Sequence, residues 1–594
     1  MSLSTSHTLN AVAPISAPTG FLKPGDALWV EKGAYTLYEH PETIIQADDA
    51  ASVTGALNEI DRLVAEGFTA VGGLSFEAAP AFDEAFQVHQ QTEVPAAWFG
   101  VYSSGRSVAF PEHNLRDSEL PTWKSQSDQK HFDQKIGRIK NYIEAGDTYQ
   151  INYTYPLKAD GIADPLQWAL NRLAHSRVQY GGILHLGSHL VVSLSPELFF
   201  EVNGDTLTTC PMKGTAPRGR YRAEDDANRD GLKHSEKDRA ENIMIVDLLR
   251  NDMGKISKTG SVDVLSTFDV NPFDAVWQMT STIESKTAAS IPEIFSALFP
   301  SGSVTGAPKI RSMEIIHELE DQSRGMYCGS IGCWKPNRRA VFNVAIRTAT
   351  IDLCASTGVY PVGAGITWGS EVESEYKECQ MKAEVLRGQK PEFQLFESLL
   401  WDDEFYLLDR HLRRLERAAA FFDFPFDEEA ILRKLKMDIA EFDRQARKIR
   451  VLLDRYGNLT VESEPVQTPG VHRVGIAHQS IDETSVFLRY KTTSRKSYEE
   501  AKAGFETYDD VLLWNSKREL TESTRANVVV QIDGVKYTPP VDCGLLGGTF
   551  REELLERGEI TERVLKIDEL QVAEKIWCIN SVRQWIDIEV EFQN

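Results

Sequence analysis

The arrangement of apolar and polar positions predicts helices and strands at several places in this chain. In the segment 235–252 (SEKDRAENIMIVDLLRND), the residues from Ile243 to Leu249 supply an apolar face, and the pattern predicts a helix. The charged segment from Glu371 to Leu386 predicts another helix. Further on, residues 393–408 predict two short strands around the acidic turn Asp402-Asp403, and the Arg- and Leu-rich segment 409–420 predicts a helix.

The character of the chain changes near residue 390, just after the second of these helices. Because 594 residues are too many for a single hydrophobic core, two or more domains are expected. The polar, Pro-containing stretch ESEPVQTPG indicates a further joint. We predict a flexible N-terminus over 1–24, a first domain over 25–388, and a second domain over 392–594 with an internal joint near 462–470.

Composition and charge limit the classes of function. The formal net charge of -24 argues against nucleic acid or an anionic membrane as the main partner, because both require a basic surface; a local basic pocket for a small anion remains compatible with it. The seven cysteines are widely spaced, and Cys328 with Cys333 makes a poor zinc pattern, so reduced thiols in a cytoplasmic protein are expected. Neither a signal peptide nor an apolar stretch of the ~18 residues needed for a membrane span is evident.

Two predicted helices offer carboxylates at helical spacing. Asp238 and Glu241 are three residues apart, and Glu375, Glu378 and Lys382 follow i, i+3, i+7, so each set lies on one helical face. Mg²⁺ prefers a few carboxylates together with water and substrate oxygens, so two such helices could hold it. The spacing alone is more typical of two solvated helix faces.

Nine segments between residues 130 and 386 resemble the chorismate-binding enzymes, which include anthranilate synthase, isochorismate and salicylate synthases, and aminodeoxychorismate synthase component I. The segments, in the order of the family, are GDTYQIN (146–152), SPELFF (195–200), PMKGTAPRG (211–219), AENIMIVDLLRND (240–252), FPSGSVTGAPKIRSMEIIHELE (299–320), YCGSIG (327–332), AIRTA (345–349), GAGI (363–366) and ESEYKECQMKA (373–383). The resemblance implies an α/β (α+β) fold, a sandwich with the substrate pocket between antiparallel sheets. The segment 25–125 is expected to complete it.

The same resemblance implies a set of site residues. Glu241 and Glu378 match the direct Mg²⁺ ligands, with Asp238 and Glu375 beside them and acting through water. The positions that hold the carboxylates of chorismate are matched by Thr305, Tyr327, Arg347, Gly363 and Lys382. A planar guanidinium such as that of Arg347 suits a carboxylate because it can bond both oxygens.

Two positions separate the members of this family. Water-adding members carry a lysine base where this chain has Gln150, and an amide cannot take a proton from water at neutral pH. Anthranilate synthases carry alanine where this chain has Lys213, whereas aminodeoxychorismate synthases carry the lysine. Its neutral amine would attack C2 of chorismate as the C4 hydroxyl leaves, and Glu197 resembles the acid that protonates that hydroxyl. The other interpretation is a lysine that only binds a carboxylate.

The downstream region resembles the fold type IV pyridoxal-phosphate enzymes, which include branched-chain aminotransferases, D-amino-acid aminotransferases and aminodeoxychorismate lyase. The matching segments are RHLRRLERAA (410–419), RYKTTSRKSY (489–498), ELTESTRANVVV (519–530), LLGGTFREELL (545–555) and INSVRQW (579–585). The resemblance implies two α/β subdomains. It assigns the cofactor-binding lysine to Lys491, the partner of the pyridine nitrogen to Glu522, and phosphate contacts to Arg414 and Thr549 with help from Ser581. Taken singly, a lysine flanked by threonines such as Lys491 is more typical of a solvated strand edge.

Together the two resemblances predict an enzyme of folate precursor synthesis. Aminodeoxychorismate synthase component I would make 4-amino-4-deoxychorismate from chorismate and ammonia with Mg²⁺, and a lyase domain with pyridoxal phosphate would release pyruvate and 4-aminobenzoate. No Gly-x-Cys-x-Gly loop of a glutaminase is found, so the chain is expected to need a separate glutamine amidotransferase subunit as a partner, or free ammonia. Type IV enzymes are commonly dimers, which implies a possible homodimer through the second domain.

Three alternatives stay open from the sequence. The second domain could be a true aminotransferase behind the synthase, and the first could be an anthranilate synthase-like enzyme. A non-catalytic subunit that binds chorismate would be expected to lack Lys213, Glu197, Lys491 or the Mg²⁺ carboxylates, and all of them are present.

Overall fold

The structure is a computed structural model, and it describes residues 21–90, 92–108, 121–125, 128–176, 178–219, 222–273, 276–387, 393–422, 424–439, 445–466 and 470–592. The chain forms two compact units, Met1–Arg218 with Asn228–Gln389, and Gly219–Ala227 with Lys390–Asn594. Residues 1–20 of the expected flexible N-terminus lie outside the described residues. Among the described residues, no helix is long and apolar enough to cross a membrane.

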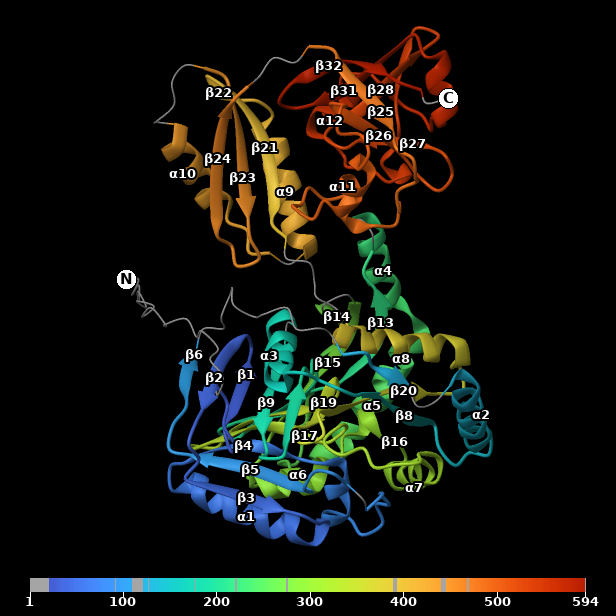
Figure 1. Cartoon of the computed structure of the whole chain (residues 1–594). Helices are drawn as coiled ribbons and strands as arrows, with labels where there is room; N and C mark the ends of the chain where they lie inside the picture. Colours follow the sequence, from blue (N-terminus) through green and yellow to red (C-terminus); the bar gives the residue numbers. More distant parts are fainter. Residues whose placement is uncertain are drawn as a thin grey trace. The chain divides into compact units, whose positions relative to one another are not determined.

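The first unit contains two large antiparallel sheets (Figure 1). The described strands of the first sheet run in the order β16-β8-β20-β19-β10-β9-β1-β2-β6, and β7 pairs with β8 outside this order. Their bounds are β1 Ala27–Glu31, β2 Ala34–Tyr38, β6 Arg106–Val108, β7 Lys124–Ser125, β8 Gln150–Ala159, β9 Tyr180–His185, β10 His189–Ser193, β16 Gly306–Ala307, β19 Thr348–Asp352 and β20 Thr357–Ile366. The long β8–β20 pairing, from Gly358↔Ala159 to Ile366↔Ile151, places Gln150 and Gly365 at the same end of the sheet.

The second sheet has the order β13-β15-β12-β11-β18-β17-β4-β5-β3, and β14 pairs with β15. Its strands are β3 Thr43–Ala47, β4 Thr69–Leu74, β5 Ala97–Tyr102, β11 Leu198–Asn203, β12 Thr206–Cys210, β13 Met212–Pro217, β14 Asp263–Phe273, β15 Val276–Lys286, β17 Ser330–Lys335 and β18 Arg339–Val344. Every pairing in both sheets is antiparallel within the described residues. The predicted antiparallel α/β sandwich is therefore confirmed.

Three apolar clusters show how the layers pack. One cluster joins the facing sides of the two sheets and contains Trp29 of β1 and Trp98 of β5. The other two lie between a sheet and its helices, α1 and α6 on the second sheet and α2, α3 and α8 on the first. Because the middle of each sheet is covered on both faces, strands such as β5, β8 and β18 are buried on both sides, whereas β14 alternates between exposed and half-buried residues.

Side-chain hydrogen bonds cap the N-termini of several helices in this unit. The side chain of Asp49 caps α1, and Ser290 with Glu293 forms a capping box at α6. The bounds are α1 Ala50–Ala65, η1 Phe76–Ala81, α2 Gln129–Glu144, α3 Pro165–His175, α4 Arg222–His234, α5 Glu236–Gly254, α6 Ile291–Leu298, η2 Gly302–Val304, α7 Lys309–Leu319 and α8 Val372–Arg387. The first residues of α4, up to Ala227, are counted with the second unit. Both predicted helices are present as α5 and α8, but Ile243 is exposed because the buried face of α5 runs through Asn242, Ile245 and Leu249.

The second unit consists of two α/β parts. An antiparallel sheet in the order β22-β21-β23-β24 packs against α9 and α10, and a mixed sheet has the order β27-β26-β25-β32-β31-β28-β29-β30. The bounds of the first part are β21 Leu395–Asp402, β22 Glu404–Phe405, α9 Leu408–Phe422, α10 Glu428–Ile439, β23 Arg447–Leu453 and β24 Leu459–Pro465. Those of the second are β25 His472–Ile476, η3 Val486–Leu488, α11 Lys496–Lys502, β26 Asp510–Trp514, β27 Leu520–Ser523, β28 Asn527–Ile532, β29 Val535–Thr538, η4 Val541–Cys543, α12 Thr549–Glu556, β30 Thr561–Glu562, η5 Ile567–Val572, β31 Lys575–Asn580 and β32 Gln584–Val590.

Two local expectations are refined in this unit. The turn at Asp402-Asp403 is present, with Asp403 at φ +60°, but the second strand is only β22. The stretch from Glu462 to Pro465 continues β24, so the passage from one sheet to the other falls between β24 and the start of β25 at His472. Residues 467–469 within it lie outside the described residues.

Candidate active sites

In the first unit, Lys213 projects from β13 toward β20 and β8. A Cβ placed on Gly365 of β20 would lie 2.6 Å from Lys213 Nζ and 3.4 Å from Gln150 Nε2. The predicted residues Lys213 and Gln150 therefore lie on the two sides of Gly365, a glycine that was not itself predicted as a site residue. Both polar atoms of the buried Gln150 side chain lack a hydrogen-bond partner within the described structure, so this amide is available to a ligand beside the lysine.

The surroundings of Lys213 lower the pKa of its amine. Burial lowers the pKa of Lys213, and the positive charge of Lys382 acts in the same direction. Glu241, Glu197 and Glu378 oppose this effect without reversing it. An amine with a depressed pKa is a better nucleophile at neutral pH, because more of it is unprotonated.

Glu197 is buried on the chain just before β11, where it faces the same charges. Ser303 Oγ donates a hydrogen bond of 2.7 Å to Glu197 Oε1, and Ser301 Oγ lies 3.0 Å from Ser303 Oγ. Burial raises the pKa of Glu197 to about 7, although the Ser303 hydrogen bond and the Lys213 charge act against it. A carboxyl group that is half protonated at neutral pH can serve as a general acid.

The four predicted Mg²⁺ carboxylates project from α5 and α8. Glu241 Oε1 accepts a hydrogen bond from Thr367 Oγ1 (3.0 Å), and Glu378 forms an ion pair with Lys382 (2.8 Å) that lowers the pKa of Glu378. Within the described part of the chain, no three His, Cys, Asp or Glu side chains converge on one metal-sized site. Glu241 and Glu378 both act electrostatically on Lys213. Two carboxylate ligands from the protein are enough for Mg²⁺ when substrate oxygens and water complete its coordination shell.

The two outer carboxylates differ in their surroundings. Asp238 lies against β13, since a Cβ on Gly214 would meet Asp238 Oδ1 at 3.1 Å. Glu375 is buried, with Lys237 Nζ at 4.0 Å, and burial raises the pKa of Glu375. The structure thus places Asp238 beside the strand of Lys213 and Glu375 on the turn of α8 next to Glu378.

The predicted carboxylate-binding residues surround the same end of the first sheet. Lys382 Nζ donates to the carbonyl of Gly363 (2.8 Å), and the backbone carbonyl of Lys382 accepts from Tyr360 Oη (3.2 Å). The positive charge of Arg347 acts to lower the pKa of Tyr360, against the effect of burial. The backbone of Arg347 takes a left-handed conformation with φ +48°. Tyr327 is buried near Tyr360.

Thr305 belongs to a loop that is braced against α5. Its hydroxyl donates to the carbonyl of Ser301 (3.0 Å), and its own carbonyl accepts from Asn152 N (2.8 Å). At the end of this loop, Lys309 Nζ lies 2.9 Å from Asp252 Oδ2, and both side chains are largely buried. The ion pair ties the loop that carries Thr305 and Ser303 to the helix that carries Glu241.

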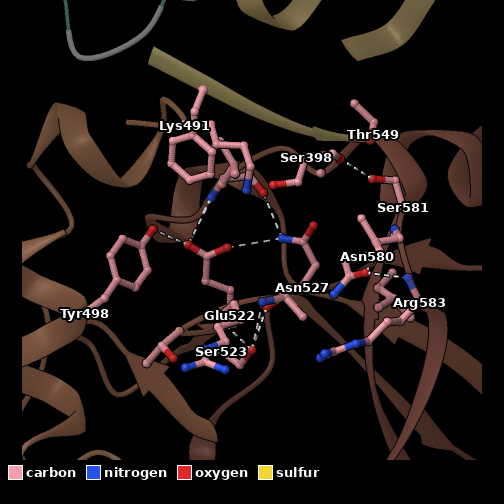
Figure 2. A pocket seen from close by; sticks show the side chains of 18 of the residues that line it. Ser398, Lys491, Tyr498, Glu522, Ser523, Asn527, Thr549, Asn580, Ser581 and Arg583 are labelled. Atoms are coloured by element: carbon pink, nitrogen blue, oxygen red, sulfur yellow. Dashed lines mark hydrogen bonds between the residues drawn. The ribbon is translucent and has the colours of Figure 1, made fainter. Parts of the chain in front are cut away.

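The second unit contains a cavity of about 470 Å³. Phe396, Arg414, Lys491, Glu522, Thr549 and Ser581 are among its lining residues, so all five predicted cofactor residues meet there. Figure 2 shows Lys491, Glu522, Thr549 and Ser581 around it. Lys491 follows η3 and belongs to no regular strand. The next residue, Thr492, forms an isolated antiparallel β-bridge with Leu395. The alternative of a solvated strand edge for Lys491 is therefore wrong.

Burial lowers the pKa of Lys491 to about 7, and the charge of Arg414 adds to this effect. Its Nζ lies 4.7 Å from the ring centre of Phe396. Glu522 at the other side of the cavity accepts hydrogen bonds from Tyr498 Oη (2.8 Å) and Asn527 Nδ2 (3.4 Å), as Figure 2 shows. Burial raises the pKa of Glu522 to about 7 in spite of the Tyr498 hydrogen bond.

A chain of buried hydrogen bonds connects Arg414 with Thr549 in the wall of the cavity. Arg414 forms two hydrogen bonds to Glu397 (2.8 and 2.6 Å), and His411 Nδ1 lies 2.7 Å from Glu397 Oε2. His411 Nε2 in turn lies 3.1 Å from Thr549 Oγ1 at the first position of α12. The hydroxyl of Ser581 donates to the carbonyl of Ser398 (3.4 Å).

The remaining lining of this cavity is strongly basic. It includes Lys448, Arg450, Arg495, Lys502, Arg525 and Arg583, against the two acids Glu499 and Glu522. Such a lining favours a ligand with more than one negative group.

Two family profiles match the chain. The profile of the chorismate binding enzymes matches residues 22–388, and that of the class IV amino-transferases matches residues 394–590. The chain belongs to the chorismate binding enzymes, and it carries a C-terminal class IV aminotransferase domain.

Individual relatives match the first unit. An anthranilate synthase component 1 from Haloarcula marismortui is 40% identical over 271 residues, which are 45% of this chain and 53% of that protein. Aminodeoxychorismate synthase component 1 from Escherichia coli K12 is 38% identical over 266 residues, 43% of this chain and 56% of that protein. The chain thus spans about half the length of the curated relatives it matches. Because both kinds of synthase match about equally, overall identity does not separate them.

A solved structure supports the same fold. The crystal structure of anthranilate synthase component I from Streptococcus pneumoniae TIGR4 aligns with a TM-score of 0.51 at 22% identity. The alignment covers 65% of this chain and 95% of that one, so most of the first unit shares its architecture.

Several residues of both sites were not found from the sequence. Ser303 and Thr367 hold Glu197 and Glu241, and Glu397 and His411 connect Arg414 with Thr549. Ser303 lies in a motif that the resemblance had already marked, so its hydroxyl could have been considered. Glu397 lies in a strand with no motif of its own, and only the fold brings it under Arg414.

Proposed function

We propose that this chain is an aminodeoxychorismate synthase component I joined to an aminodeoxychorismate lyase. The observation that carries the proposal is the position of the Lys213 amine and the Gln150 amide around Gly365, with the buried acid Glu197 acting on the charge of Lys213. A primary amine with a depressed pKa beside a carboxyl group that is half protonated at neutral pH is suited to displacing a hydroxyl group. An anthranilate synthase-like enzyme would not need this amine.

In the first reaction, Lys213 Nζ attacks C2 of chorismate while both ring double bonds shift and the C4–O bond breaks. Glu197 gives its proton to the departing oxygen, which leaves as water. Ammonia then attacks C4, the bond from Lys213 to C2 breaks, and the lysine returns to its free form. Burial of both groups supports these roles, because it favours the neutral amine and the neutral acid together.

The carboxylates and cations around Lys213 would hold the substrate. Glu241 and Glu378 fit Mg²⁺ by their donor chemistry, with Asp238 and Glu375 acting through water, and the ion would neutralise the ring carboxylate of chorismate. Arg347, with Tyr327, Thr305, Lys382 and the amide of Gly363, would bind the enolpyruvyl carboxylate; Gln150 would contact the ring beside Lys213.

In the second reaction, the cavity of the C-terminal domain would hold pyridoxal phosphate. The residues fit that group: Arg414 and the first turn of α12 offer donors to a phosphate, and Glu522 faces Lys491 across the cavity. When bound, the cofactor supplies an electron sink next to the substrate amine. Glu522 would keep the pyridine nitrogen protonated, Ser581 would assist at the phosphate, and Lys491 would move the proton at C4 before pyruvate leaves.

The basic lining of this cavity supports the lyase over an aminotransferase of apolar amino acids. Aminodeoxychorismate carries two carboxylates in addition to the phosphate of the cofactor, and Arg450 and Arg583 are cations that line the cavity beyond Arg414. A transaminase remains the second candidate because the domain belongs to the class IV aminotransferases. Addition of 2-oxoglutarate with an amino acid donor distinguishes them, since only a transaminase completes both half-reactions.

Further features follow from this assignment as proposals. Ammonia would come from a separate glutamine amidotransferase subunit, and the C-terminal domain would form a homodimer. The synthase domain would span 25–388 and the lyase domain 392–594, in a cytoplasmic protein.

The experiment that tests the proposed function supplies the full chain with chorismate, ammonium salt, Mg²⁺ and pyridoxal phosphate. We expect 4-aminobenzoate and pyruvate in equal amounts. Production of anthranilate instead would reject the assignment of Lys213, and accumulation of aminodeoxychorismate without pyruvate would reject the lyase.

A further inference from the structure

His411 is completely buried between a carboxylate and a hydroxyl group of the second cavity. Its Nδ1 lies 2.7 Å from Glu397 Oε2, and its Nε2 lies 3.1 Å from Thr549 Oγ1. No part of the proposed chemistry uses this histidine. Because His411 is hydrogen-bonded to Thr549, its protonation state decides whether the Thr549 hydroxyl can donate a hydrogen bond to a ligand.

Glu397 fixes which ring nitrogen carries the proton. Burial would raise the pKa of Glu397, but Arg414 and His411 outweigh it and hold the pKa at about 2, so Glu397 is a carboxylate and can only accept. The hydrogen on Nδ1 of His411 therefore points at Glu397 in every protonation state that keeps this bond. The state of Nε2 is the variable one.

With a neutral imidazole, Nε2 is an acceptor, and Thr549 must donate its single hydroxyl proton to it. Thr549 then turns only lone pairs toward the cavity, which repel the oxygens of a phosphate. With an imidazolium, Nε2–H donates to Thr549 Oγ1, and the hydroxyl proton of Thr549 is released for a phosphate oxygen. Both arrangements keep the heavy atoms where they are.

The surroundings favour the neutral form while no anion is bound. Burial lowers the pKa of His411, and the charges of Arg414 and Lys491 act in the same direction, while Glu397 opposes them. Among the described residues, the charged groups that act on the ring are Arg414 of α9, Lys491 after η3 and Glu397 of β21. A phosphate dianion bound at Arg414 and Thr549 would add negative charge and reverse the balance.

We propose that His411 is a positioning residue for the cofactor phosphate, and that it takes up a proton through the Thr549 hydrogen bond when the phosphate binds. The proposal rests on the proposed function, because that assigns the phosphate to Arg414 and Thr549. The N-terminus of α12 is consistent with this proposal. Its N-cap residue, Gly548, has no side chain to accept hydrogen bonds from the backbone amides of the first turn, so these amides can donate to a phosphate.

The test measures proton uptake on binding of pyridoxine 5′-phosphate, which carries the phosphate and the ring but has no aldehyde to react with Lys491. Calorimetric titrations of the full chain at pH 8 in buffers of different ionisation enthalpy give the number of protons bound. We expect the wild type to take up close to one proton more than His411→Gln. By reciprocity, its affinity should fall more steeply than that of the variant as pH rises from 7 to 9.

The same titrations yield affinities. His411→Gln should bind about tenfold more weakly at pH 7, because a charge-assisted hydrogen bond is lost, and the two proteins should converge at high pH. Thr549→Ser keeps the hydroxyl and should retain the proton uptake. Equal proton uptake by wild type and His411→Gln would overturn the proposal and leave the cofactor assignment intact. Failure of the wild type to bind pyridoxine 5′-phosphate would overturn both.

Discussion

Gly365 leaves the space that the amine of Lys213 occupies: a Cβ at position 365 would lie 2.6 Å from Lys213 Nζ. The lysine end is flexible, so Gly365→Ala should fold but displace the amine. A displacement of about 1 Å at a reacting atom costs on the order of 10²-fold in rate. We therefore expect the rate of aminodeoxychorismate formation to fall by about that factor, while pyruvate release from added aminodeoxychorismate is unchanged.

Gly369→Ala is the matched control, because a Cβ at 369 meets nothing within 4 Å. It should keep the wild-type rate. If Gly365→Ala also kept it, the amine would not need its present position, and its role as a nucleophile would be in doubt.

The hydrogen bond from Ser303 to Glu197 predicts a shift in the pH profile of the synthase. Ser303 stabilises the carboxylate form, so Ser303→Ala should raise the pKa of Glu197 above about 7. Since the acid form is the active one, the high-pH limb of kcat, measured at saturating ammonia, should move upward by about one unit. Ser301→Ala is the control, because Ser301 contacts Ser303 and not Glu197. A downward shift, or an equal shift in both variants, would contradict the acid role.

Glu522→Gln should impair only the lyase. A glutamine cannot keep the pyridine nitrogen protonated, so we expect pyruvate release to fall at least about 10²-fold with an unchanged synthase rate. Glu499→Gln changes the other acid of the same cavity and should have little effect. The measurement is the rate of pyruvate release from added aminodeoxychorismate. A fully active Glu522→Gln variant would remove Glu522 from the cofactor site.

The ion pair between Lys309 and Asp252 should stabilise the loop of Thr305. Loss of one partner of a buried pair leaves an uncompensated charge, so Asp252→Ala should lower the local free energy of opening by about 3 kcal/mol. Asp247→Ala on the exposed side of α5 should change it by less than about 0.5 kcal/mol. Amide hydrogen exchange of α5 and α7 gives both values. Equal protection in the two variants would show that the pair does not hold the loop.

Helix and strand patterns predicted much of the architecture, and the reason is visible in α5. Its apolar positions gave the helix, and the spacing of Asp238 and Glu241 put both acids near one face. The pattern did not identify the buried face, because Ile243 is exposed while the polar Asn242 is buried. Burial of Asn242 depends on β15, where Ser281 donates to it, and no local pattern contains that contact.

The site residues that lie in recognisable motifs could be predicted from the sequence. Lys213, Gln150 and Lys491 could be singled out because each lies in a segment that resembles a family. Glu397 and His411 could not, because their importance arises only when β21, α9 and α12 pack together. A single sequence contains the partners of such a network but not their distances.

The most direct test of the central claim is the mass of the protein during the first turnovers. Wild type mixed with chorismate and Mg²⁺ without ammonia, and quenched rapidly in acid, should contain protein that is heavier by chorismate less one water, with the addition located in the peptide 211–219. Lys213→Ala should show none and should not form aminodeoxychorismate. Absence of the heavier species in the wild type, together with normal turnover of Lys213→Ala, would contradict the account.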